Sequence, residues 1–189
     1  MSIGMKQGTV YLEPHQSEWE KAAEETIRKL KNILDDIAVD IQHIGSASVK
    51  TISAKPIIDI AVVVNDFNDI LSMREELRQN GIIYRFEESP EQLLFVMGDF
   101  EKDTRSHHIH VVLYASDEWN NYINFRNYLN THIAAEKEYE QVKLRLAEQY
   151  PDDRIAYTDG NQEVIDKLLA EARLWKENSY SSNWDSSPI

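Results

Sequence analysis

Two neighbouring segments of this chain carry residue types that suit a phosphate-and-metal site. The first, HIGSAS at residues 43–48, follows an apolar run and turns on Gly45-Ser46. A Gly-Ser turn at the end of a strand offers backbone N–H groups and a hydroxyl that hold phosphate oxygens. The second, KPIIDI at residues 55–60, places Asp59 in an apolar, β-branched run. Because a carboxylate there is costly unless it is paired, hydrogen-bonded or metal-bound, the two segments predict a phosphate-binding turn beside a metal ligand.

A third segment, HHIH at residues 107–110, adds two candidate imidazole ligands. In a strand, His108 and His110 lie on one face, since successive side chains alternate. Two histidines at i and i+2 can reach a single ion, and Asp59 on a nearby strand would complete the ligand set. The structural alternatives are a pair of partly exposed strand histidines and an edge aspartate that caps a neighbouring backbone group.

Two basic residues next to these segments are candidate phosphate ligands. Lys55 is held extended by the proline that follows it, and Arg105 precedes the histidine strand. Either could neutralise a phosphate, the arginine through a bidentate contact. The alternative for each is a solvated surface charge.

Three further side chains near the Gly-Ser turn are candidate contributors. His43 lies two residues before the turn and could face the same pocket, although a structural histidine is an equal alternative. The hydroxyls of Ser46 and Ser48 are candidate phosphate contacts. Neither serine lies in a G-x-S-x-G elbow, so a nucleophilic serine is not predicted.

Composition limits the partners of the protein. The 189 residues include 20 Lys and Arg against 33 Asp and Glu, a formal charge of −13. This acidity argues against general nucleic-acid binding and against adhesion to anionic membranes, so an anionic substrate needs a locally positive pocket or a cation. The chain has no cysteine, which excludes disulfides, thiolate catalysis and cysteine-ligated metal. With no apolar h-region in residues 1–14 and no run of about 18 apolar residues, a cytoplasmic protein is expected.

The pattern of apolar residues predicts an α+β protein: a small mixed β-sheet flanked by helices, with a helical C-terminal third. A capping box at Ser17 and Glu20 indicates the start of the first long helix. Strands are predicted at residues 9–12, 39–44, 57–64, 82–86, 93–97 and 107–114. Helices are predicted at residues 17–34, 69–79, 117–130, 134–149 and 161–175. The serine-containing tail at residues 176–189 is predicted to be disordered.

Three of these motifs together resemble the GrpB (UPF0157-type) family, which is placed in the nucleotidyltransferase superfamily. They are HIGSASV at residues 43–49, KPIIDI at residues 55–60 and HHIHVV at residues 107–112. Further matches are EW, FRNYL and YTD at residues 118–119, 125–129 and 157–159. The resemblance covers residues 10–174, which are identified as one GrpB-like domain.

The resemblance implies a nucleotidyltransferase-like sheet followed by C-terminal helices. In that superfamily a Gly-Ser turn holds a nucleoside triphosphate, and a D-x-D pair with a third carboxylate binds two divalent ions. Residues 45–46 match the turn and Asp59 matches the first carboxylate. Ala61 stands at the second carboxylate position, and His108 and His110 stand on the strand that would carry the third. The resemblance therefore implies either a metal site rebuilt from Asp and His or a loss of the transferase chemistry.

These observations predict a protein that binds a nucleotide or another phosphorylated small molecule with a divalent metal. The reaction expected is transfer of a nucleotidyl or phosphoryl group to a small acceptor. Asp59 is the candidate catalytic residue and anchor ligand. Mg²⁺ or Mn²⁺ is expected, and the histidines make Zn²⁺ or another transition metal the alternative. The alternative functions are a non-catalytic ligand-binding module on the same fold, a single-metal Asp/His phosphohydrolase, and a protein that binds partners through its acidic surface.

Overall fold

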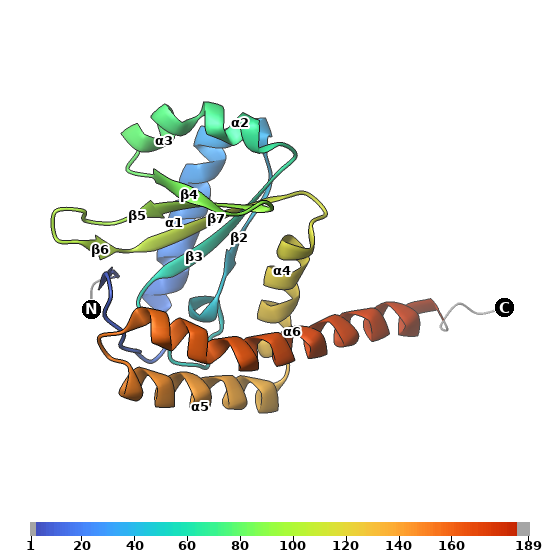
Figure 1. Cartoon of the computed structure of the whole chain (residues 1–189). Coiled ribbons are helices and arrows are strands. Elements are labelled where there is room, and N and C mark those ends of the chain that lie inside the picture. Colours follow the sequence, from blue (N-terminus) through green and yellow to red (C-terminus); the bar gives the residue numbers. More distant parts are fainter. Residues whose placement is uncertain (1–2, 185–189) are drawn as a thin grey trace.

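A five-stranded mixed sheet forms the centre of the protein (Figure 1). The computed structural model describes residues 3–184, with every side chain in that range except those of residues 88 and 180–184. The strands lie in the order β2-β3-β7-β5-β4, and all neighbours are antiparallel except β3 and β7, which run parallel. Their bounds are β2 (Ala38–Ile44), β3 (Ile58–Val64), β7 (His107–Leu113), β5 (Gln92–Met97) and β4 (Ile83–Ser89). Two short strands, β1 (Met5–Lys6) and β6 (Thr104–Arg105), pair separately.

One face of the sheet holds the main core beneath a long helix. This helix is α1 (Ser17–Leu34), and α2 (Phe67–Ser72) and α3 (Arg74–Gln79) extend the same layer. The buried core includes Trp19, Ala23, Leu30 and Leu34 from α1 and Ile58, Ile60, Val62 and Val64 from β3. Complete burial of one such branched side chain contributes about 1.5–3 kcal/mol. Because side chains alternate along a strand, Asp59 and Ala61 point to the opposite face of the sheet.

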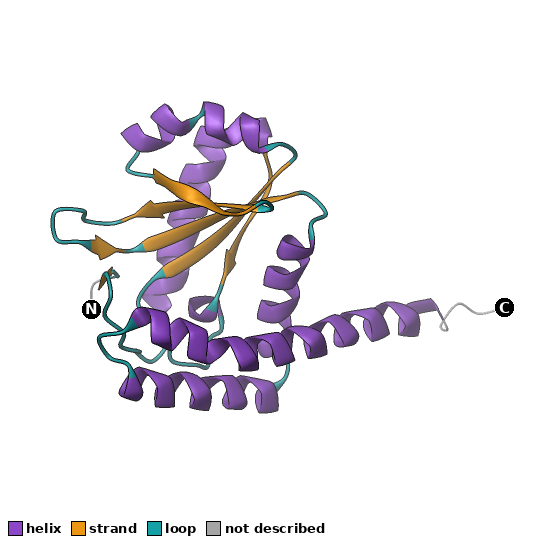
Figure 2. Cartoon of the chain, viewed as in Figure 1, coloured by secondary structure: helices purple, strands orange, loops and turns teal. Residues whose placement is uncertain are grey.

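That opposite face is approached by the helical C-terminal third (Figure 2). Its helices are α4 (Asp117–Leu129), α5 (Ile133–Gln149) and α6 (Arg154–Trp184). Their own core joins α4, α5 and α6 to the loop that follows the Gly-Ser turn, through Val49, Ile52, Leu129, Ala135, Tyr139, Val164 and Leu168. A mixed sheet with helices on both sides and a helical last third confirms the predicted fold class.

The N-terminal prediction needs correction. Residues 9–12 form no strand, because Val10 N donates to Pro151 O and the segment lies along the α5–α6 connection instead. The first helix begins at Ser17 as predicted, but the predicted capping box is absent, since the Ser17 hydroxyl donates to the adjacent Glu18 carboxylate. The helix predicted at residues 69–79 is divided into α2 and α3.

The last helix is longer than predicted at both ends. It begins at Arg154, so the YTD motif at residues 157–159 lies in its first turns. It also continues through residues 176–184, where the sequence analysis predicted disorder. Packing of the Trp175 ring against His132 and Tyr128, with centroids 5.5 and 6.0 Å apart, anchors the helix just before this extension. The remainder of the predicted tail, residues 185–189, lies outside the described residues. Within residues 3–184, no helix is both long and apolar enough to cross a lipid bilayer.

Candidate functional site

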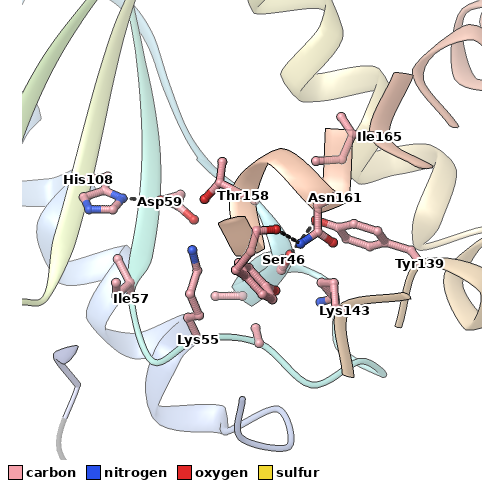
Figure 3. A pocket seen from close by; sticks show the side chains of 14 residues that line it. Ser46, Lys55, Ile57, Asp59, His108, Tyr139, Lys143, Thr158, Asn161 and Ile165 are labelled. Atoms are coloured by element: carbon pink, nitrogen blue, oxygen red, sulfur yellow. Dashed lines mark hydrogen bonds and ion pairs between the residues drawn. The ribbon is translucent and has the colours of Figure 1, made fainter. Parts of the chain in front are cut away.

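A cavity of about 180 Å³ lies between the sheet and the C-terminal helices (Figure 3). Its walls come from the Gly-Ser turn, residues 54–57, the start of β3 and β7, one face of α5 and the first turns of α6. Asp59 and Lys55 line it from the sheet side, and Lys143 and Asn161 line it from the helices. Five separate parts of the chain therefore meet at one polar pocket.

Asp59 and two histidines form a candidate metal centre at one side of this cavity. In the parallel pairing of β3 with β7, Asp59 lies opposite His108 and Ala61 lies opposite His110. The Asp59 Oδ1 atom is 3.2 Å from His108 Nδ1 and 3.7 Å from His110 Nε2. The candidate ligand atoms all lie within 4.8 Å of one another. One carboxylate and two imidazoles form a donor set that suits Zn²⁺, Mn²⁺ or Fe²⁺.

The surroundings of Asp59 keep its carboxylate ionised. Burial raises the pKa of Asp59, but the hydrogen bonds and charges of His108 and His110 outweigh burial and lower this pKa below its ordinary value. A metal ligand must be deprotonated to bind. The carboxylate therefore has the protonation state that metal binding requires.

Two residues behind His110 orient its ring. Gln92 Nε2 lies 3.1 Å from His110 Nδ1, and the Tyr122 hydroxyl donates to Gln92 Oε1 over 2.7 Å. The Tyr122 ring also packs beside the imidazole, with centroids 5.4 Å apart. Because the Gln92 amide nitrogen can only donate, Nδ1 of His110 accepts and the ring proton lies on Nε2, toward Asp59. Ligation of an ion through Nε2 requires this proton to move to Nδ1 and the Gln92 amide to turn so that its oxygen accepts from Nδ1–H. In this arrangement the Nε2 atom of His110 is the one presented to Asp59.

The Gly-Ser turn lies directly against the Asp59 carboxylate. Gly45 has a φ of +70°, and a Cβ atom on this residue would lie 2.5 Å from Asp59 Oδ2. Both the left-handed backbone and the close approach require glycine here. Ser46 follows in the cavity wall, with its hydroxyl 3.1 Å from the Tyr139 hydroxyl. The structure thus brings the predicted turn and the predicted metal ligand into contact.

Two lysines, the half-buried Lys55 and the buried Lys143, supply positive charge to the cavity. Burial lowers the pKa of Lys55, an effect that nearby Asp59 opposes, and Lys55 Nζ lies 5.2 Å from the centre of the Tyr157 ring. Among the described residues, Lys55 Nζ has no hydrogen bond or ion pair. Lys143 is 2% exposed and donates from Nζ to Ser53 O over 2.6 Å. Burial lowers the pKa of Lys143 to about 7. The charged and neutral forms of this side chain are therefore both populated near neutral pH.

The structure does not bring three of the predicted phosphate ligands into the cavity. His43 pairs with Ile60 and so faces the core side of the sheet, where burial lowers its pKa to about 4. The Ser48 hydroxyl donates to Gly45 O over 2.6 Å and closes the turn from within. Arg105, on β6, donates to Gln7 and Thr104 and stacks on Phe100. These partners occupy the polar groups of Ser48 and Arg105, whereas His43 is directed away from the cavity.

Several cavity residues were missed by the sequence analysis, chiefly Lys143, Tyr157, Thr158 and Asn161. One pattern in the sequence does indicate Lys143. It lies four residues after Tyr139 and three before Leu146, and therefore on the apolar face of its helix. A lysine on a buried helical face is rare enough to suggest a function. The residues of α6 had no such pattern, because the start of that helix was placed too late.

The buried position of Lys143 predicts a pH-dependent stability. With a pKa of about 7 when folded and an ordinary pKa of 10.5 when unfolded, the unfolded chain binds more protons between these values. The free energy of unfolding should therefore rise from pH 7 toward pH 9, by about 2 kcal/mol if Lys143 dominates. Glu140 opposes and Lys55 reinforces the low pKa. Urea unfolding across this pH range measures the effect.

Substituting Lys143→Met should remove this rise. Lys137→Met is the matched control, because Lys137 is an exposed lysine of the same helix. Equal pH slopes in the wild type, in Lys143→Met and in Lys137→Met would show that Lys143 is not titrating in this range.

Comparisons with known proteins identify the family of this chain. The sequence model of the family described as GrpB protein matches residues 9–171. The glutamate-rich protein GrpB of Alkalihalophilus pseudofirmus is 36% identical over 172 residues, which are 89% of this chain and 99% of that protein. UPF0157 protein YqkA of Bacillus subtilis is 28% identical over 169 residues, 89% of this chain but 49% of that protein.

Solved structures extend the comparison to the fold. The crystal structure of conserved protein GrpB from Enterococcus faecalis aligns with a TM-score of 0.76 and 28% identity, covering 85% of this chain and 98% of that one. A Cid1 poly(U) polymerase structure with MgGTP bound aligns with a TM-score of 0.50 and 14% identity, covering 71% of this chain and 44% of that one. At this identity, the second likeness concerns the nucleotidyltransferase-like fold alone.

Proposed function

Because the chain belongs to the GrpB family and has a nucleotidyltransferase-like fold, we propose that its cavity binds the phosphate groups of a nucleotide, or of another phosphorylated small molecule, together with a divalent metal ion. One observation carries the proposal: the Gly45 turn and the Asp59 carboxylate are in contact, with no room for a Cβ atom between them. A ligand held by the turn would therefore lie next to an ion held by Asp59.

The phosphate half of the proposal is supported by local charge. The chain as a whole carries −13, yet the cavity is lined by two lysines. Lys55 Nζ has no hydrogen-bond acceptor among the described residues, and the backbone N–H groups of the Gly45-Ser46 turn add partial positive charge. A phosphate in the cavity would also favour the charged form of Lys143, whose pKa of about 7 leaves it partly neutral in the free protein.

The metal half is supported by the Asp59, His108 and His110 group. Among the residues whose side chains are described, this is the one group of three or more such side chains close enough to hold an ion. Ala61 stands at the second carboxylate position and offers no ligand atom. The site is therefore suited to one ion rather than two. The two imidazoles favour Mn²⁺ or Zn²⁺ over Mg²⁺. Such an ion, when bound, withdraws negative charge from a phosphate oxygen.

The reaction we propose is transfer of a nucleotidyl or phosphoryl group to a small acceptor. The turn at residues 45–46 would hold the phosphate chain, and Lys55 and Lys143 would stabilise the negative charge that moves to the leaving group. Asp59 would fix the position of the transferred phosphorus atom through its contact with the turn. Holding the reacting groups in line is the main demand of this chemistry.

Calorimetric titration tests the proposal. Each of the four ribonucleoside triphosphates is added to the protein with Mn²⁺, Zn²⁺, Mg²⁺ or a chelator. We expect saturable binding that is lost in chelator, with a matching rise in melting temperature. Inorganic phosphate and pyrophosphate are titrated in the same way as probes for any other phosphorylated ligand. Absence of binding in every combination, with the protein shown to be folded, would refute the proposal.

Product analysis then separates the possible activities. Pyrophosphate or nucleoside diphosphate released only when an acceptor is present indicates transfer. Phosphate release without an acceptor indicates a single-metal hydrolase, which the Asp/His ligand set also suits. Metal-dependent binding with no product indicates a binding module.

Lys55 should contribute directly to affinity. We expect Lys55→Met to weaken binding of the triphosphate by about tenfold or more, since a desolvated charged contact contributes about 1.5–3 kcal/mol. Lys50→Met is the matched control, because Lys50 lies on the surface and pairs with Glu20. Calorimetry on both variants measures the difference. If the two substitutions weaken binding equally, Lys55 has no special role.

A further inference from the structure

Asn161 is an unusual residue of the cavity wall because the oxygen of its side-chain amide has no hydrogen-bond partner among the described residues. It lies on α6, is 3% exposed and lines the cavity beside Ser46 and Tyr139 (Figure 3). Its Nδ2 atom donates to Tyr157 O over 2.7 Å. Its Oδ1 atom is buried and accepts no hydrogen bond. A buried carbonyl oxygen left in this state costs about 1–3 kcal/mol, so its retention calls for an explanation.

The orientation of this amide follows from its hydrogen bond to the backbone of Tyr157. Tyr157 O is a backbone carbonyl and can only accept, so the amide nitrogen must face it. Rotating the amide by 180° would place Oδ1 against this carbonyl oxygen and leave the nitrogen without an acceptor. Because both residues lie on the same rigid helix, four positions apart, Oδ1 stays free to accept a hydrogen bond from outside the helix.

We propose that Asn161 Oδ1 accepts a hydrogen bond from a sugar hydroxyl of the bound ligand, and so selects ribonucleotides over their deoxy counterparts. The free acceptor pairs with a hydrogen-bond donor of the ligand, whereas Lys55, Lys143 and the Gly-Ser turn, which also line the cavity, suit the acceptor oxygens of phosphate. A ligand that satisfies both carries phosphate and hydroxyl groups together. This inference rests on the proposed function and narrows its substrate class.

The physical basis for selection is the cost of an unpaired buried group. A site built to accept from a hydroxyl discriminates against an analogue that lacks it, because the acceptor is then left buried and unsatisfied. One such hydrogen bond corresponds to about tenfold in affinity. If the 2′-deoxy analogue binds more weakly by this factor, the 2′ hydroxyl contacts Asn161. If the 3′-deoxy analogue does, the 3′ hydroxyl makes the contact.

The test compares ribonucleoside triphosphates with their 2′-deoxy and 3′-deoxy forms, titrated with Mn²⁺ into the full-length protein. We expect one deoxy series to bind about tenfold more weakly than the ribonucleotides. Asn161→Leu preserves the size of the side chain and removes the acceptor. In this variant the affinity for ribonucleotides should fall to that of the weaker deoxy series, and the affinity for the deoxy series should be unchanged. The exposed neighbour Gln162 provides the control Gln162→Leu, which should retain the discrimination.

The outcomes separate this inference from the proposed function. Equal binding of ribonucleotides and both deoxy forms by the wild-type protein overturns the role of Asn161 and leaves the phosphate and metal site intact. Selection that persists unchanged in Asn161→Leu also overturns it. If no nucleotide binds, the nucleotide form of the proposed function fails, and this inference fails with it. If Asn161→Leu does not fold, the comparison of ligands on the wild-type protein can still overturn the inference, and Asn161→Asp, which keeps an acceptor oxygen, replaces it as the variant: loss of the selection in that variant would also overturn the inference.

Discussion

Asp59→Asn is expected to abolish metal-dependent ligand binding while the protein remains folded. Asparagine preserves the size of the side chain but removes the negative charge that lies 3.2 Å from His108 Nδ1 and 3.7 Å from His110 Nε2. A neutral amide is a poor ligand for Mn²⁺ or Zn²⁺, so we expect the metal affinity to fall by at least about 100-fold. Calorimetric titration of Mn²⁺, with and without a nucleoside triphosphate, measures this loss.

The control for this experiment is a carboxylate away from the site. Asp69→Asn changes an exposed residue of α2 and should leave both titrations unchanged. Circular dichroism and the unfolding midpoint establish that each variant is folded. Metal binding by Asp59→Asn at the wild-type affinity would show that the Asp59, His108 and His110 group is structural, and the proposed metal site would have to be abandoned.

Gly45→Ala is expected to produce the largest combined loss of stability and binding. The new Cβ atom would lie 2.5 Å from Asp59 Oδ2 and 3.0 Å from Asp59 Cβ, and the backbone φ of +70° is itself unfavourable for alanine. The turn and the carboxylate must therefore move apart. We expect the free energy of unfolding to fall by about 3 kcal/mol or more and metal-dependent ligand binding to be lost.

Gly81→Ala separates the contact from the backbone strain. Gly81 has a similar φ of +78°, but an added Cβ atom would meet nothing within 4 Å. This control should lose only about 1 kcal/mol and should bind ligand as the wild type does. Urea unfolding of both variants gives the comparison. Equal losses at the two positions would mean that the Gly45 turn can relax away from Asp59, and the contact would then not constrain the site.

Much of the sheet could be predicted because the alternation of apolar and polar residues along a strand depends only on the local backbone. The alternation of apolar residues in Ile58–Val64 placed Asp59 on the face away from the core, and the structure buries the other face against α1. The same alternation placed His108 and His110 together on β7. Strand periodicity depends only on the backbone, so it is readable before any tertiary contact is known.

The errors in the site came from residues whose direction depends on pairing. His43 was a candidate for the cavity because it lies close to Gly45 in sequence, with a structural histidine as the equal alternative. The antiparallel register pairs Ile44 with Asp59 and His43 with Ile60, which turns the histidine toward the core. Arg105 was a candidate phosphate ligand, with a solvated surface charge as the alternative. It lies on β6 and stacks on Phe100, a contact that the sequence does not indicate.

The sequence by itself determined which residues could act and which of them share a strand face: the Gly-Ser turn, Asp59, and the histidine pair on β7. Only the tertiary structure decided that β3 and β7 are parallel neighbours, which sets Asp59 opposite His108. It also decided that α5 and α6 close the cavity with Lys143 and Asn161. The physical reason is that the side-chain period is a property of the local backbone, whereas strand order and helix docking depend on burying apolar surface across the whole chain.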